Sequence, residues 1–204
     1  MKPPFVAEPG PNGRPAYKDR PAERRPPGPV SAAWLQRVAL YYLERYSAST
    51  EMLRRTLARR VDKRARLRGE DPAPFAEQID ATVARAVSAG LVDDVRFADM
   101  RLATLRRRGT SSRGAAAKLA AKGVPRDVVE AAMQAERDAI PDVEAADIEL
   151  QAARAYAKRR RLGMHRRPDT RALHRDRDLG ALARAGFSYD LARRVVDADP
   201  DEME

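Results

Sequence analysis

Few residues of this 204-residue chain have side chains that could carry out a reaction. Nucleophilic catalysis needs a Ser or Cys beside a base, usually a histidine, and the only histidines are His165 and His174, in an arginine-rich stretch. We interpret both as exposed surface residues, because neither lies in a recognisable catalytic motif. Asp93 and Asp94 could in principle bind a metal, but helix capping explains them more simply. We therefore expect no catalytic residues, no metal site and no cofactor.

Basic residues, by contrast, recur at spacings that suit contact with a phosphate backbone. One group lies on or just after one predicted helix and on the next, so that a single corner would gather Arg101, Arg106, Arg107, Arg108, Arg113, Lys118 and Lys122. A second group, Arg154, Lys158 and Arg161, is spaced by four and three residues on one predicted helix face. Such stripes can follow nucleic acid, but cations at helix C-termini also complement the helix dipole. Both interpretations stay open, and the ten residues are candidate contacts to DNA or to an acidic protein surface.

The overall charge points the same way. Lys and Arg total 40 against 30 Asp and Glu, which gives a formal net charge of +10. An excess of this size favours approach to polyanions such as nucleic acid, although a merely solvated basic surface would show it too. The chain has no cysteine, which excludes disulfides and thiolate metal sites. No apolar stretch approaches the ~20 residues that span a bilayer, so we expect a cytoplasmic protein that does not enter a membrane.

Aromatic residues make up only 5% of the chain. Trp34, Tyr41 and Tyr42 flank the first apolar stripe, and at helical spacing an aromatic side chain belongs to a core more often than to a base-stacking surface. We therefore predict that these rings are core residues. A core this poor in aromatics must be built from Leu, Val, Ile and Ala, which favours closely packed helices.

The elements that would position these residues are all predicted to be helices. Residues 1–31 hold nine of the fifteen prolines among scattered charges, and we expect a disordered basic tail. From there the apolar residues follow helical periodicity, and Gly and Pro divide them into nine helices. The sequence predicts an all-α fold of three tandem three-helix repeats, over residues 32–91, 92–140 and 141–199, followed by an acidic end at 200–204.

Three junctions between predicted helices share one design. They read Gly90-Leu91 followed by Asp94, Gly123-Val124 followed by Asp127, and Gly186-Phe187 followed by Asp190. Each is predicted to end a helix at a glycine, to bury the apolar residue that follows, and to place a carboxylate in the first turn of the next helix. Caps are expected at Ser49 or Thr50, Asp93 or Asp94, Ser111 or Ser112, and Ser188.

At these junctions the chain resembles the RecX family, small helical regulators of the RecA recombinase. The matching stretches are residues 89–98 (AGLVDDVRFA, which contains Phe97), 108–114 (RGTSSRG), 119–125 (LAAKGVP) and 184–190 (RAGFSYD). The resemblance covers about residues 34–198. Residues 47–53 (SASTEML) depart from the family's usual start of the second helix, and residues 61–74 are longer than expected.

The resemblance implies an elongated, curved module that lodges in the groove of the RecA–DNA filament. There a RecX-like protein would limit ATP hydrolysis and strand exchange by the recombinase, or alter the stability of the filament, in DNA repair and recombination. It implies a monomeric regulatory protein, not an enzyme, whose partners are the recombinase filament and its single- or double-stranded DNA. A general DNA-binding or architectural helical protein is the alternative.

Overall fold

A computed structural model describes residues 27–139 and 145–199 of the chain. Within these ranges it contains nine α-helices, two short 3-10 helices and no strand, so the all-helical prediction is confirmed. The helices are α1 (Ala32–Leu43), α2 (Thr50–Arg68), η1 (Ala73–Phe75), α3 (Ala76–Ser88), α4 (Asp94–Arg107), α5 (Ser112–Ala121), α6 (Arg126–Asp138), α7 (Ala145–Arg160), η2 (Gly163–His165), α8 (Pro168–Arg184) and α9 (Tyr189–Val196). Most of the predicted tail and the whole predicted acidic end lie outside the described residues.

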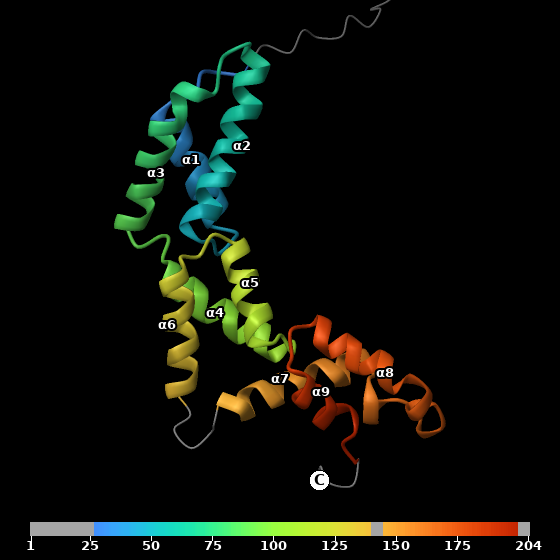
Figure 1. The fold of residues 1–204 in the computed structure, drawn as a ribbon. Coiled ribbons are helices and arrows are strands. Elements are labelled where there is room, and N and C mark those ends of the chain that lie inside the picture. Colours follow the sequence, from blue (N-terminus) through green and yellow to red (C-terminus); the bar gives the residue numbers. More distant parts are fainter. Residues whose placement is uncertain (1–26, 140–144, 200–204) are drawn as a thin grey trace, which may run out of the picture.

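The helices form three groups of three along an elongated arc (Figure 1). We refer to α1–α3, α4–α6 and α7–α9 as repeats 1, 2 and 3. Each repeat has its own buried cluster of Leu, Val, Ile and Ala side chains, centred on fully buried leucines such as Leu57, Leu119 and Leu182. Repeat 3 turns to one side of the line formed by the other two, which gives the module its curvature (Figure 1).

Five helices begin at a side chain that caps them. The oxygen of each capping residue accepts a hydrogen bond from the backbone N–H three residues later, which satisfies a donor left open in the first helical turn. The caps are Ser31, Ser49, Asp93, Ser111 and Ser188. Where the sequence left two candidates, the first of the pair is the cap in each case.

The residue just before a cap is buried, and this corrects one predicted junction. Leu91 was expected at the corner after Gly90, but it is exposed and Val92 is buried instead. Two residues separate Gly90 from the cap Asp93, whereas one residue separates the glycine from the helix start at the other two junctions. The extra residue turns Leu91 outward and brings its neighbour against the core, as in a hydrophobic staple.

The other junction residues have the following places. Val124 and Phe187 are buried at their corners, and Phe97 is buried in α4. Asp127 and Asp190 lie in the first turns of α6 and α9, where a carboxylate interacts favourably with the helix dipole.

The second helices of the three repeats are joined end to end. Ser49, which caps α2, donates its hydroxyl hydrogen bond to the Lys122 carbonyl at the C-terminus of α5. Ser111, which caps α5, donates in the same way to the Ala185 carbonyl at the C-terminus of α8, at 2.6 Å. Both serines are fully buried. The two boundaries between repeats therefore use the same contact, which we call the serine-to-carbonyl joint. In it the C-terminus of one helix faces the N-terminus of a helix in the repeat before it, and the two helix ends carry opposite partial charges.

A carboxylate reinforces each joint. The Thr50 N–H at the start of α2 donates to Asp94 Oδ1 of repeat 2 at 2.8 Å. The Ser112 N–H at the start of α5 donates to both carboxylate oxygens of Glu149 in repeat 3 at 3.0 Å. In both cases a repeat supplies an acid to an open N–H of the repeat before it. Asp94 thus serves the boundary between repeats, while Asp93 caps α4.

Repeat 3 contains one buried charged side chain, Asp178 of α8. Its two oxygens accept bonds from the Nε and Nη2 atoms of Arg166, each at 2.7 Å, and the oxygen bonded to Nε also accepts from the Gly163 N–H at 2.9 Å. These bonds hold η2 and the residues after it against α8. None of the helices in the described ranges is long and apolar enough to cross a membrane.

Candidate functional site

The candidate contact residues are mostly exposed on the surface of repeats 2 and 3. Eight of the ten are exposed, and they are Arg107, Arg108, Arg113, Lys118, Lys122, Arg154, Lys158 and Arg161. None of these eight forms an ion pair within the part of the chain that the structure describes. Their charges are therefore available to a partner.

The sequence suggested that the first group would gather at a single corner, but in the structure it does not. Arg107, Arg108 and Arg113 lie where α4 gives way to α5, near the boundary with repeat 3. Lys122 lies at the other end of α5, about 14 Å away along a ten-residue helix. There it faces repeat 1, so the basic residues of repeat 2 are divided between the two boundaries.

Arg106 differs from its neighbours because its side chain is only 13% exposed. It donates to Glu136 of α6, to Glu149 of α7 and to the hydroxyl of Ser112. Burial alone would lower the pKa of Arg106, but the hydrogen bonds and charges of the two glutamates outweigh it and raise the pKa above its ordinary value. Arg106 thus ties repeat 2 to repeat 3, and we leave it out of the proposed contact surface.

This role predicts a loss of stability on replacement. Arg106→Gln removes the charge and leaves two partly buried carboxylates without their partner, so we expect the free energy of unfolding to fall by about 2 kcal/mol. The measurement is urea unfolding followed by circular dichroism. Arg108→Gln is the matched control, since Arg108 is exposed and unpaired, and it should change stability by less than about 0.5 kcal/mol. Equal effects of the two substitutions would contradict the assignment.

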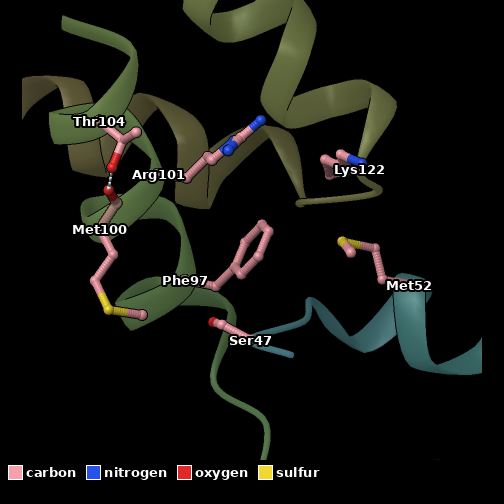
Figure 2. A pocket seen from close by; sticks show the side chains of 7 residues that line it. All are labelled: Ser47, Met52, Phe97, Met100, Arg101, Thr104 and Lys122. Carbon is pink, nitrogen blue, oxygen red and sulfur yellow. Dashed lines mark hydrogen bonds between the residues drawn. The ribbon is translucent and has the colours of Figure 1, made fainter. Parts of the chain in front are cut away.

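A groove opens where repeats 1 and 2 meet. Figure 2 shows Arg101 of α4 and Lys122 on two sides of it, above Phe97, while Met52 and Met100 lie along its edges. Arg101 is half-buried and forms no ion pair among the described residues. The groove thus combines an apolar floor with two cations that no carboxylate neutralises.

The second group of candidates lies at the end of α7. Arg154 and Lys158 are on the helix, but α7 ends at Arg160, so Arg161 is not on the same helical face as predicted. The Leu162 N–H donates to the Ala157 carbonyl and closes the helix, and Arg161 adopts a left-handed φ of 55° just after its end. The stripe is therefore shorter than the spacing suggested, and its last cation lies on the loop.

The histidines are half-buried, which differs from the exposed positions expected. Burial lowers the pKa of His165, and the charges of Lys158 and Arg171 lower it further. Both effects favour the neutral form of the His165 imidazole. In the described ranges no group of three His, Asp or Glu residues is placed to hold a metal ion.

Helix α2 is a basic surface that the sequence reasoning missed. Eight of its 19 residues are Lys or Arg. Arg59, Arg60 and Lys63 are exposed and form no ion pair in the described part of the chain. The density of cations in this one helix was a signal in the sequence. It was missed because the apolar stripe on the same helix indicated a core element.

Comparison with known proteins decides the family. A model of the RecX second three-helix domain matches residues 93–133, which cover α4, α5 and part of α6. A protein of Myxococcus xanthus (strain DK1622) named "Regulatory protein RecX" is 42% identical over 185 residues, 89% of this chain and 95% of that protein. The chain belongs to the RecX family.

A second RecX relative extends the comparison. "Regulatory protein RecX" of Agrobacterium fabrum (strain C58 / ATCC 33970) is 30% identical over 174 residues, which is 84% of this chain and 86% of that protein. No solved structure matches the chain significantly. As a member of the RecX family the chain is a regulatory protein and not an enzyme.

The RecX domain match contains most of the candidate contact residues. Residues 93–133 contain seven of the ten candidate contacts, as well as Ser111 and Ser112 of the joint with repeat 3. The remaining three, on and after α7, lie beyond this match but within the span shared with the two relatives.

Proposed function

We propose that this RecX-family protein binds the filament that a RecA-like recombinase forms on DNA and inhibits its ATP hydrolysis and strand exchange. One observation carries the proposal: exposed, unpaired cations occur on all three repeats of a single arc, at α2, α5 and α7. A surface of this kind suits a long, repetitive and negatively charged partner. The protein would act in the cytoplasm, where DNA and recombinase meet, and as a monomer when free.

The arc supports a mechanism of bridging and competition. Each repeat alone offers few contacts, but linked repeats bind as one multivalent unit, because the first contact raises the effective concentration of the others. Bound along a filament, the arc would hold neighbouring subunits in one arrangement and occupy surface that a second DNA strand needs. In repeat 1 the cations that would make these contacts are Arg59, Arg60 and Lys63 of α2. In repeats 2 and 3 they are Arg101, Arg107, Arg108, Arg113, Lys118, Lys122, Arg154, Lys158 and Arg161.

The test is the rate of ATP hydrolysis by the recombinase on single-stranded DNA. We expect amounts of this protein well below one per recombinase subunit to reduce the steady-state rate, because one arc spans several subunits. A combined Arg107→Gln and Arg108→Gln variant should need a higher concentration for the same effect. An unchanged rate at saturating protein would contradict regulation of the filament, and an increased rate would contradict inhibition.

A general DNA-binding protein is the second candidate, and the net charge of +10 favours it. The two candidates differ in what they bind best. Binding to naked DNA and to recombinase-coated DNA should be compared over a salt series, since phosphate contacts weaken steeply with salt. A preference for the coated DNA supports the regulator, and a steep salt dependence without such a preference supports the alternative.

A further inference from the structure

The groove between repeats 1 and 2 is part of a longer one. Three hollows adjoin along α1, α2 and α4, because each shares lining residues with the next. The hollow between α1 and α2 shares Tyr42 and Thr56 with a middle hollow, which in turn shares Met52 and Lys122 with the hollow of Figure 2. We call this continuous depression the α1–α4 groove.

The α1–α4 groove is lined by cations and by no acid. None of the described residues that line its three parts is Asp or Glu. Five of its cations form no ion pair in the described part of the chain, and they are Arg37, Arg59, Arg60, Arg101 and Lys122. An uncompensated row of this length offers positions for several successive phosphates.

The end of the groove on repeat 1 carries two exposed aromatic rings, and one of them, Tyr41, was predicted from the sequence to be a core residue. Tyr41 is 57% and Tyr46 is 59% exposed. The Tyr46 ring lies against Tyr42 with centroids 5.2 Å apart, and the Arg45 guanidinium covers the Tyr41 ring at 3.7 Å. Two exposed rings contribute little to folding, but each contacts a neighbouring side chain and lines the groove.

We propose that the α1–α4 groove binds a single strand of nucleic acid, with phosphates on the unpaired cations and bases stacked on Tyr46 and on the Tyr41–Arg45 pair. Aromatic rings and arginine planes beside a basic track are the means by which proteins hold single strands without reading their sequence. A duplex cannot use the rings, because its base faces are stacked within the helix. An acidic protein segment could use the cations but would leave both rings without a role.

This inference rests on the proposed function, because it is there that the arc meets the DNA strand of a filament. Its test needs no recombinase. The probe is a fluorescent oligothymidylate of about ten nucleotides, titrated with the full-length protein and followed by anisotropy. Tyr41→Ala and Tyr46→Ala should each weaken binding roughly five- to 150-fold, the loss measured for one stacked base. The same two substitutions should change binding to a duplex of the same length only slightly.

Tyr189→Ala is the matched control. Tyr189 is 61% exposed on α9, away from the groove, and its replacement should leave the affinity for oligothymidylate unchanged. Circular dichroism of each variant checks that the helices are intact.

Salt dependence separates the two kinds of contact. The logarithm of the binding constant for a single strand falls with the logarithm of salt concentration by about 0.7 for each phosphate contact. Arg60→Gln should therefore reduce the slope by about 0.7, while Tyr46→Ala should weaken binding at every salt concentration without changing the slope. Arg177→Gln, an exposed arginine of α8 outside the groove, should change neither.

The outcomes separate this inference from the proposed function. If the tyrosine variants bind oligothymidylate like the wild type, the inference is overturned, even when the protein still inhibits the recombinase. If they then lose inhibition of ATP hydrolysis, the groove contacts the recombinase protein instead. If oligothymidylate binding falls as expected but the wild type has no effect on the recombinase, the groove assignment holds and the filament proposal fails.

Discussion

Gly109→Ala is expected to lower the free energy of unfolding by about 2–5 kcal/mol, because it combines two separate costs. Gly109 ends α4 with a left-handed φ of 68°, which an L-residue adopts at a cost of about 1–2 kcal/mol. A Cβ atom at this position would also lie 2.3 Å from the Tyr156 backbone nitrogen and 2.7 Å from the Ala152 carbonyl oxygen. Both atoms belong to the backbone of α7, so the clash is relieved only if repeat 3 moves away from repeat 2.

Gly90→Ala is the control for this effect. Gly90 has nearly the same φ, 67°, but nothing lies within 4 Å of a Cβ added there. Gly90→Ala should therefore lower the free energy of unfolding only by the cost of the left-handed conformation, about 1–2 kcal/mol. Urea unfolding measures the difference, and small-angle X-ray scattering should show a changed overall shape for the Gly109 variant alone. Equal losses in the two variants would show that the contact with α7 does not constrain this boundary.

Asp178→Ala should destabilise the protein by about 3 kcal/mol, mostly in repeat 3. The substitution leaves the guanidinium of Arg166 and the N–H of Gly163 without their acceptor in a partly buried place. The estimate lies at the lower end of the range for a broken buried pair, because the Arg166 side chain is 23% exposed and water can reach it. Asp176→Ala on the same helix is the control, since Asp176 is almost fully exposed and should lose little.

The same carboxylate makes stability depend on pH. Burial would raise the pKa of Asp178, but the hydrogen bond from Arg166, then the Gly163 N–H and the Arg166 charge, lower it below the ordinary value. The unfolded chain therefore binds a proton at a higher pH than the folded one. The contribution of Asp178 is fully present above about pH 4, the ordinary range of an aspartate, and is lost as the pH falls through the folded value.

Unfolding midpoints measured over a pH series test this linkage. Below about pH 4 the stability of the wild type should fall toward that of Asp178→Ala, and the gap between them should be constant at higher pH. His165 affects stability at a higher pH. Because its pKa is lowered in the folded state, the unfolded chain takes up the proton first as the pH falls through the ordinary range of a histidine, about 6.5, and the folded state loses stability there. A gap that stays constant to the lowest pH would contradict the role given to Asp178.

Local chemistry made most of the fold predictable. Helix starts follow from Ser49, Asp93 and Ser111, whose side chains cap the turn that directly follows them, and helix ends follow from glycines that adopt a left-handed conformation. Both signals act within about four residues, so they can be read without knowing the rest of the molecule. The one error at a junction, Leu91 for Val92, arose because the corner depends on the number of residues before the cap.

The function of individual side chains was less predictable because it depends on distant partners. Arg106 is a tie between repeats only because Glu149, 43 residues later, comes to lie beside it. Tyr41 lies beside the apolar stripe of its helix, where the sequence predicted a core residue, yet its side chain is exposed. Charge and periodicity identify which residues could bind, whereas the neighbours that bury or expose them are set by the packing of whole repeats.

The serine-to-carbonyl joint has a consequence for how such molecules can vary in size. Each copy of the joint places one unit on the next with the same donor and acceptor, so the connection between units is set locally at each boundary. A fourth unit that supplied the same terminal carbonyl and carboxylate would lengthen the arc without altering the units already present. The reach of the molecule along a partner can thus change in whole steps, by gain or loss of a unit.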